Sequence, residues 1–152
     1  MRVALDTNVL VYAEGFGDAA RCLAARKLMA QLIEQDVVLP AQTLGELSRV
    51  LTTKAGRSPE QTRQAVLEWG DSFVVADSTW TCFQAALDLT VVHQMPIWDA
   101  LILAVAAEQR CRILLSEDFQ DGFTWRGITV VNPFTNPPSP QLRRLLTNSS
   151  PS

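Results

Sequence analysis

Four acidic residues lie where their carboxylates could act together. Asp6 and Asp118 each follow a short apolar run, while Glu46 and Asp99 lie in segments with helical apolar spacing. Short apolar runs of this kind predict buried strands, and in parallel sheets ligands bind beyond the carboxyl ends of the strands. We therefore expect the four carboxylates to converge at that edge of the sheet.

A divalent cation would explain such a cluster. Clustered carboxylates repel one another and lose hydration, so without compensation they stay protonated. Hard oxygen ligands in a partly open site suit Mg²⁺ or Mn²⁺, which can activate water and stabilise charge on a phosphoryl group. No basic residue accompanies the acids locally, and their sequence neighbours include Thr7, Asn8, Ser48 and Ser116.

Each acid taken alone also has an ordinary structural explanation. Asp6 could cap the short helix that follows it, and Asp99 could be a first-turn acid favoured by the helix dipole. Glu46 fits a solvated helix position, and Asp118 and Asp121 could form a turn. The joint pattern of two strand-end acids and two acids on apolar helices favours a shared site.

Strands and helices alternate along the chain, which predicts an α/β fold. Apolar runs predict strands at 2–5, 36–40, 72–77, 111–118 and 127–133. Helical spacing and cap residues predict helices at 19–34, at 41–53, from Pro59 after a Ser58 cap, from Ser78 or Thr79 to about His93, and at 95–110. We expect one domain over residues 1–133, with a short parallel sheet of about five strands flanked by helices on both faces. Residues 134–152 are rich in Pro and Ser and predict a mobile or weakly docked tail.

Composition narrows the class of protein. With 152 residues and 47% apolar residues, one domain with its own core is expected. No run of 18 apolar residues and no signal-peptide pattern occur, so we expect a cytoplasmic protein without a membrane span. Cys22, Cys82 and Cys111 lie far apart, which argues against disulfides and against a zinc site. The net charge of −3 decides little, because four acids in one metal pocket would account for it.

Four segments resemble the motifs of the PIN domain family, most closely its bacterial VapC-type toxins. In order and spacing they are VALDTNVLVYA, LGELSRVL, IWDALILAVA and LLSEDFQDG, and the resemblance spans roughly residues 2–133. It implies a metal-dependent ribonuclease with an acidic quartet of Asp6, Glu46, Asp99 and Asp118. Asn8 and Ser116 match the family's supporting polar positions. Within the fourth motif, Asp118 fits best because it stands two residues after Ser116, and Glu117 and Asp121 remain alternative or additional acids.

The resemblance also implies a mechanism and partners. Asp6, Asp99 and Asp118 would hold one Mg²⁺ or Mn²⁺, with Glu46 reaching it directly or through water. Hydrolysis of RNA would leave a 5′-phosphate and a 3′-hydroxyl, without a histidine base, and we expect His93 at the surface. Toxins of this type commonly form homodimers and are silenced by a small antitoxin, for which the apolar helices at 19–33 and 42–53 could supply surfaces.

Substrate affinity must come from cationic side chains near the metal edge. Arg49, Arg57 and Arg63 lie on or after the Glu46 helix and are the candidates for contacting RNA. Unpaired RNA best fits an open site at a sheet edge, so we expect single-strand selectivity. Trp98 could stack on a base, but its position in a helical core pattern predicts packing instead.

Three other kinds of protein share some of these features. A receiver-type signalling domain would place an acid pair after the first strand and a lysine after the last, whereas no lysine follows residue 54. A haloacid-dehalogenase-type phosphatase would need a second acid two residues after Asp6, where Asn8 stands. A catalytically idle PIN domain that binds RNA or acts as a scaffold is the remaining alternative, and the intact quartet argues against it.

Overall fold

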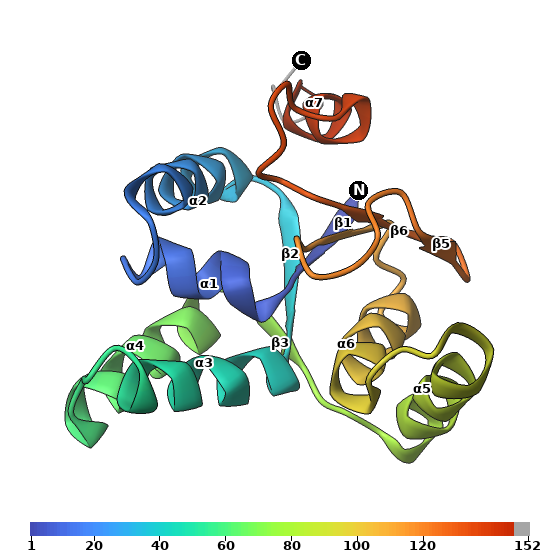
Figure 1. Cartoon of the computed structure of the whole chain (residues 1–152), viewed down its shortest axis with the longest axis horizontal. Helices are drawn as coiled ribbons and strands as arrows, with labels where there is room; N and C mark the ends of the chain where they lie inside the picture. The colour runs from blue at the N-terminus through green and yellow to red at the C-terminus, as the bar shows by residue number, and fades with distance from the viewer. Residues whose placement is uncertain (148–152) are drawn as a thin grey trace.

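Six strands and seven helices build the computed structural model, which describes residues 1–147 (Figure 1). The strands are β1 (Arg2–Leu5), β2 (Asp36–Pro40), β3 (Val74–Ala76), β4 (Ile113–Leu115), β5 (Thr124–Trp125) and β6 (Ile128–Val131). The helices are α1 (Thr7–Ala13), α2 (Ala19–Leu32), α3 (Ala41–Thr53), α4 (Pro59–Ser72), α5 (Trp80–His93), α6 (Ile97–Glu108) and α7 (Pro140–Thr147).

The sheet has the strand order β3-β2-β1-β4-β6-β5. Its first five strands in that order are parallel, as the alternation of strands and helices predicts, and β5 alone pairs antiparallel to β6. Arg126 and Gly127 connect β5 to β6, and both have positive φ values of 47° and 82°. A two-residue hairpin turn needs this conformation, and glycine adopts it without strain. The sequence did not predict β5, because two residues are too few to show a periodic pattern.

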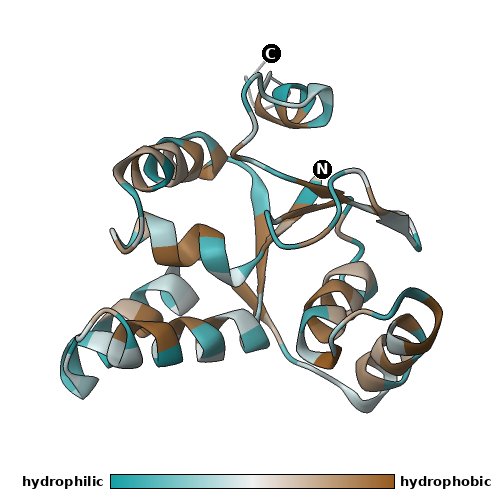
Figure 2. Cartoon of the chain, viewed as in Figure 1, coloured by the Kyte–Doolittle hydropathy of each residue, from teal (hydrophilic) through white to brown (hydrophobic). Residues whose placement is uncertain are grey.

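Helices cover both faces of the sheet and bury two apolar clusters (Figures 1 and 2). Successive residues of a strand point to opposite faces. Val3 and Leu5 therefore pack among α1 to α4 and α7, while Ala4 packs toward α5 and α6. Strands buried on both faces explain why they appear in the sequence as continuous apolar runs. Cys22, Cys82 and Cys111 are buried, as expected for small core residues.

Cap residues fix several helix starts where the sequence places them. Ser58 accepts a hydrogen bond from the backbone amide of Gln61, whose side chain accepts one from the Ser58 amide, and Pro59 is the first helical residue of α4. Thr79 caps α5 by accepting from the amide of Cys82. Reciprocal capping of this kind satisfies amides that have no partner within the helix.

The strands predicted at 72–77, 111–118 and 127–133 are shorter in the structure than in the sequence analysis. The most important case is β4, which ends at Leu115, so that Ser116, Glu117 and Asp118 belong to the following loop. These three polar residues in succession end the apolar run. Their side chains bind residues of other segments at the end of the sheet, and the strand does not continue through them.

The tail differs from the expectation of a mobile or weakly docked segment. Residues 140–147 form α7, in which Leu142 and Leu145 are buried against the cluster of α1 to α4. Their spacing of three residues places both leucines on one helical face, and Ser139 accepts from the Leu142 amide at the helix start. The last five residues of the predicted tail, 148–152, lie outside the described residues, and the domain division at residue 133 remains a prediction. Within residues 1–147, no helix combines the length and apolar character that crossing a membrane requires.

Candidate active site

Asp6 lies at the junction of β1 and α1 and makes a hydrogen bond in each element. Its backbone amide donates to the Leu115 carbonyl at the end of β4, at 3.0 Å, which continues the sheet by one position. Its side-chain Oδ1 accepts from the Thr7 amide at 2.7 Å, so Asp6 is the N-cap of α1. The capping explanation and the strand-end explanation are therefore both correct for this residue. Its carboxylate lies in the interior, with Asp6 only 2% exposed.

Ser116 connects Asp6 to the loop after β4. The Ser116 hydroxyl donates to Asp6 Oδ2 at 2.6 Å and accepts from the Asp118 amide at 3.1 Å. Burial raises the pKa of Asp6 to about 7, against the opposing effect of the bonds from Ser116 and Thr7. The charges of Asp118 and Asp99 raise the same pKa further, which places both carboxylates within electrostatic reach of Asp6.

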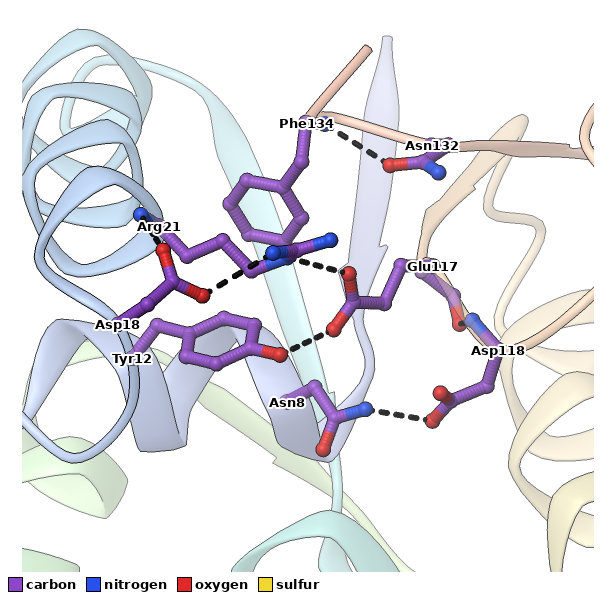
Figure 3. Close-up of polar contacts among 9 residues, drawn as sticks. Asn8, Tyr12, Asp18, Arg21, Glu117, Asp118, Asn132 and Phe134 are labelled. Atoms are coloured by element: carbon purple, nitrogen blue, oxygen red, sulfur yellow. Dashed lines mark hydrogen bonds and ion pairs between the residues drawn. The ribbon is translucent and has the colours of Figure 1, made fainter.

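Asp118 projects from this loop toward α1. Its Oδ2 accepts a hydrogen bond of 2.8 Å from the side-chain amide of Asn8 (Figure 3). Partial burial raises the pKa of Asp118, as do the charges of Glu117 and Glu46, while the bond from Asn8 lowers it. Asn8 thus compensates part of the repulsion between these acids.

Glu46 and Asp99 complete the group from two helices. Glu46 on α3 accepts from the Thr7 hydroxyl at 2.5 Å and from the Gln42 side chain at 3.0 Å. Asp99 lies in the first turn of α6 and makes no hydrogen bond or ion pair with any of residues 1–147. Burial raises the pKa of Asp99, and the charges of Asp118 and Glu46 add to the shift. The structure therefore brings the four predicted acids to one edge of the sheet.

The donor set of these four residues is suited to a hard divalent cation. Within residues 1–147, none of Asp6, Glu46, Asp99 and Asp118 forms an ion pair with a lysine or arginine. Oxygen-only ligands with this much uncompensated charge are the kind that Mg²⁺ and Mn²⁺ take. In the described part of the chain, however, no three His, Cys, Asp or Glu side chains already stand in an arrangement that would hold a metal ion.

The two remaining acids of the fourth motif bind elsewhere. Asp121 accepts from the Asn132 amide at 2.9 Å, which ties the loop to the end of β6. Glu117 projects toward α1, as Asp118 does, and binds the Tyr12 hydroxyl and the Arg21 guanidinium (Figure 3). Neither residue hydrogen-bonds to the quartet, so both fix the loop that carries Asp118.

Tyr12 and Arg21 are site residues that the sequence analysis missed. Tyr12 lies four residues after Asn8 on α1, and this spacing places both on one helical face, so the sequence contained a usable signal. Arg21 contacts Glu117 across 96 positions of sequence, for which no local pattern exists.

The three arginines proposed to contact RNA differ in their surroundings. Arg57 is already engaged, because its guanidinium binds the Glu14 carboxylate at 2.6 Å and the Glu14 carbonyl at 2.8 Å. Arg49 and Arg63 are exposed, and Arg63 borders a cleft of about 330 Å³ between α3 and α4. Of the three, Arg57 is paired with Glu14, and contact of Arg49 and Arg63 with RNA stays a prediction.

The prediction that Trp98 packs in the core is wrong. Trp98 is 52% exposed and meets Phe83 edge-to-face, with the ring centroids 6.3 Å apart. As the second residue of α6, it precedes the buried stretch of the helix, and the apolar pattern extends one turn further than the burial does. His93 is exposed, as predicted, and its ring packs edge-on against Phe123.

The fold and the acidic edge together correspond to one known class of domain. The model of the PIN domain family matches residues 3–121, which include all four acids. The chain belongs to the PIN domain family. A comparison with curated protein sequences found no match.

Solved structures of toxin–antitoxin proteins share this fold. The Mycobacterium tuberculosis toxin VapC20, described as cleaving the sarcin-ricin loop, is 21% identical over 76% of this chain and 89% of its own, with a TM-score of 0.65. The DNA-bound VapBC2 of Rickettsia felis is 17% identical over 86% of this chain and 97% of its own, with a TM-score of 0.65. FitAcB of Neisseria gonorrhoeae is 18% identical over 87% of this chain and 98% of its own, with a TM-score of 0.60. At these identities the comparison shows the fold alone.

Proposed function

We propose that the chain is a divalent-metal-dependent endoribonuclease that hydrolyses single-stranded RNA, and that it is the toxin of a toxin–antitoxin pair. The observation that carries the proposal is the convergence of Asp6, Glu46, Asp99 and Asp118 at one sheet edge without a cationic partner among residues 1–147. Perturbed carboxylates gathered in this way are a mark of functional sites.

Asp6, Asp99 and Asp118 would hold the ion, with Glu46 direct or through water. When bound, Mg²⁺ or Mn²⁺ lowers the pKa of water and neutralises charge on the phosphoryl group. Ser116 and the Thr7 amide keep both oxygens of Asp6 in place. The Thr7 hydroxyl orients Glu46.

The substrate would approach over the open side of the cluster. Asn8 and Asp99 are half-buried and Asp118 is exposed, so an extended strand can reach them, whereas a duplex would have to be opened first. Trp98 beside Asp99 offers an exposed ring on which an unpaired base could stack. Arg49 and Arg63 would bind the phosphate backbone. The products would carry a 5′-phosphate and a 3′-hydroxyl.

We further propose a small antitoxin and a second copy of the chain as partners in the cytoplasm. The support is the likeness to structures that are themselves toxin–antitoxin complexes. Among residues 1–147, α2 exposes Leu23 and Ile33 and could contribute to such contacts, as its apolar character suggests. The helix at 42–53 exposes none of its large apolar side chains, whereas α5 exposes Leu87, Val91 and Val92. The surface at α5 is therefore a better candidate than α3.

Cleavage of a labelled tRNA pool by the purified chain tests the activity. We expect cleavage with Mg²⁺ or Mn²⁺, none with EDTA, and none by Asp99→Asn. The matched control is Asp88→Asn, which removes the same charge from an exposed position on α5 and should cleave like the wild type. Equal cleavage by the wild type and Asp99→Asn would show that a contaminant cuts the RNA.

The alternative is a catalytically idle PIN domain that binds RNA. It predicts that the wild type retards single-stranded RNA in a binding assay but leaves it intact with either metal. Cleavage that requires metal and disappears in both Asp6→Asn and Asp99→Asn would exclude this alternative.

A further inference from the structure

A network of polar contacts beside the acid cluster ends on Glu117 (Figure 3). One carboxylate oxygen of Glu117 accepts from the Tyr12 hydroxyl, and the other binds Arg21 Nε at 2.9 Å. The Glu117 side chain is only 14% exposed. The next residue, Asp118, also projects toward α1 and accepts from Asn8, one helical turn before Tyr12 (Figure 3). We propose that Arg21 and Tyr12 are positioning residues, which hold Glu117 so that the Asp118 carboxylate stays directed at the acid cluster. This inference rests on the proposed function, since it takes Asp118 as a metal ligand.

The loop that carries Asp118 needs such an anchor. β4 ends at Leu115, and residues 116–121 belong to neither a helix nor a strand. The Ser116 amide still donates to the Val131 carbonyl at 3.1 Å, but Glu117 and Asp118 lie beyond this last contact with β6. The charges of Glu46 and Glu117 act on Asp118, and like charges would turn its carboxylate outward to water. Arg21 balances the charge of Glu117 and, with Tyr12, holds that side chain against α1, which keeps the adjoining Asp118 within reach of Asn8.

The anchor is itself fixed by its surroundings. Arg21 Nη1 binds Asp18 Oδ2 at 3.0 Å, and Asp18 is the N-cap of α2. The Tyr12 ring meets the Phe134 ring edge-on, with centroids 5.3 Å apart. Gly17 has a φ of +133°, and a Cβ there would lie 2.6 Å from the Tyr12 ring, so a glycine is needed for the ring to lie where it does. The contacts of Asp18, Phe134 and Gly17 thus fix Arg21 and Tyr12, the two side chains that donate to Glu117.

The expected effect of this network is on metal binding more than on stability. The ion pair of Arg21 with Asp18 is half-exposed on both sides, and exposed pairs contribute little to folding. Groups that orient metal ligands, by contrast, change metal affinity by about 10- to 100-fold when they are removed. Because Arg21 and Tyr12 act through Glu117 and not on a ligand directly, we expect the lower end of that range.

The test uses the full chain without RNA and has two readouts. Calorimetry measures the affinity for Mn²⁺, and hydrogen exchange measures the protection of the backbone amides at 116–121 in metal-free protein. The variants are Tyr12→Phe, which removes one hydroxyl, and Arg21→Gln, with Arg21→Lys as the conservative rescue. The matched control is Lys27→Gln, which removes a positive charge from an exposed position on the same helix.

We expect Tyr12→Phe and Arg21→Gln each to weaken Mn²⁺ binding about tenfold and to speed exchange at 116–121. Tyr12→Phe should keep the wild-type unfolding temperature, whereas Arg21→Gln should lower it modestly, because Glu117 is mostly buried and loses its cation. Arg21→Lys should bind Mn²⁺ more tightly than Arg21→Gln but more weakly than the wild type. The control Lys27→Gln should bind Mn²⁺ with wild-type affinity. Wild-type exchange in both variants would overturn the proposal, and so would faster exchange with unchanged Mn²⁺ affinity. A wild type that binds no Mn²⁺ would contradict the proposed function instead, and the exchange arm would still decide whether Tyr12 and Arg21 hold the loop.

Discussion

The acid cluster has two halves that are built differently. In the inner half, Asp6 is buried and both its carboxylate oxygens accept hydrogen bonds, from Thr7 and from Ser116. In the outer half, Asp99 has no hydrogen-bond partner among residues 1–147, and Asp118 is held on one oxygen by Asn8. The fold thus holds both oxygens of the inner carboxylate, whereas it holds one oxygen of Asp118 and makes no hydrogen bond to the Asp99 side chain within residues 1–147.

On the proposed function, this difference gives the two halves separate tasks. The described residues do not hold three ligands in metal-binding positions. Asp6, with both oxygens hydrogen-bonded, would supply the fixed ligand, and Asp99, whose side chain makes no hydrogen bond within residues 1–147, would adjust to the ion and to the substrate phosphate. Mg²⁺ in particular keeps several waters and binds through few carboxylates.

The largest difference should appear when one acid from each half is removed. Asp6→Ala and Asp99→Ala should each lower RNA cleavage by at least about a thousandfold, since both remove a carboxylate that we propose holds the metal. Their effects on folding should differ. At pH 6, Asp6→Ala should lower the free energy of unfolding by about 1–2 kcal/mol, because α1 loses its N-cap. Asp99→Ala should leave it unchanged or raise it, because the repulsion within the cluster decreases.

Denaturant titration in EDTA measures both variants against the wild type. Asp88→Ala on the exposed side of α5 is the matched control and should change neither cleavage nor stability. Equal destabilisation by Asp6→Ala and Asp99→Ala would show that the two halves do not differ in the way described.

The second prediction concerns pH and the inner half. The pKa of Asp6 is about 7 in the folded protein and 3.8 in its reference state, so the folded form binds the proton more tightly. Stability in EDTA should therefore fall as the pH rises from about 4 to about 7, by up to roughly 4 kcal/mol from Asp6 alone. Asp6→Asn should remove most of this fall, while Asp88→Asn keeps it. Identical slopes for the wild type and Asp6→Asn would mean that Asp6 does not carry this proton.

In both halves the sequence could predict the positions of the acids but not their contacts. Asp6 and Asp118 each follow an apolar run, so their places after a strand followed from the local pattern, and so did the order of strands and helices. The contacts that hold them join distant segments, such as Ser116 with Asp6, Asn8 with Asp118 and Arg21 with Glu117. No local pattern encodes such pairs.

The errors in the sequence analysis have the same origin. Trp98 continues the apolar pattern of α6, but no element covers that side of its first turn, and so the ring is exposed. Leu142 and Leu145 lie in a Pro- and Ser-rich segment, yet they pack into the core because α7 reaches the cluster formed by α1 to α4. In both cases the tertiary neighbours decided the outcome, and local composition did not contain that information.

The third prediction compares two residues that support the acids. Ser116→Ala removes a buried hydroxyl that donates to Asp6 and accepts from the Asp118 amide, so it affects both halves. We expect it to lower the free energy of unfolding by about 2 kcal/mol. Asn8→Ala removes one contact at the edge of the site and should cost less than about 1 kcal/mol, while still weakening Mn²⁺ binding. Urea unfolding measures the loss of stability in each variant, and calorimetry measures the affinity for Mn²⁺. If Asn8→Ala lost as much stability as Ser116→Ala, the division of the acid cluster into an inner and an outer half would be contradicted.

The smallest effect is expected at the rim of the outer half, where Trp98 stands next to Asp99. If single-stranded RNA lies over the outer carboxylates, the exposed Trp98 ring can stack on one base, and Trp98→Ala should weaken binding of a short unpaired RNA about fivefold, or about 1 kcal/mol. Trp80→Ala is the matched control, since Trp80 is also exposed but begins α5. Fluorescence anisotropy in the Asp99→Asn background measures affinity without cleavage. Equal affinity of Trp98→Ala and Trp80→Ala would place the RNA path away from α6, and the substrate would then have to enter along α3, where Arg49 and Glu46 lie on the same helix.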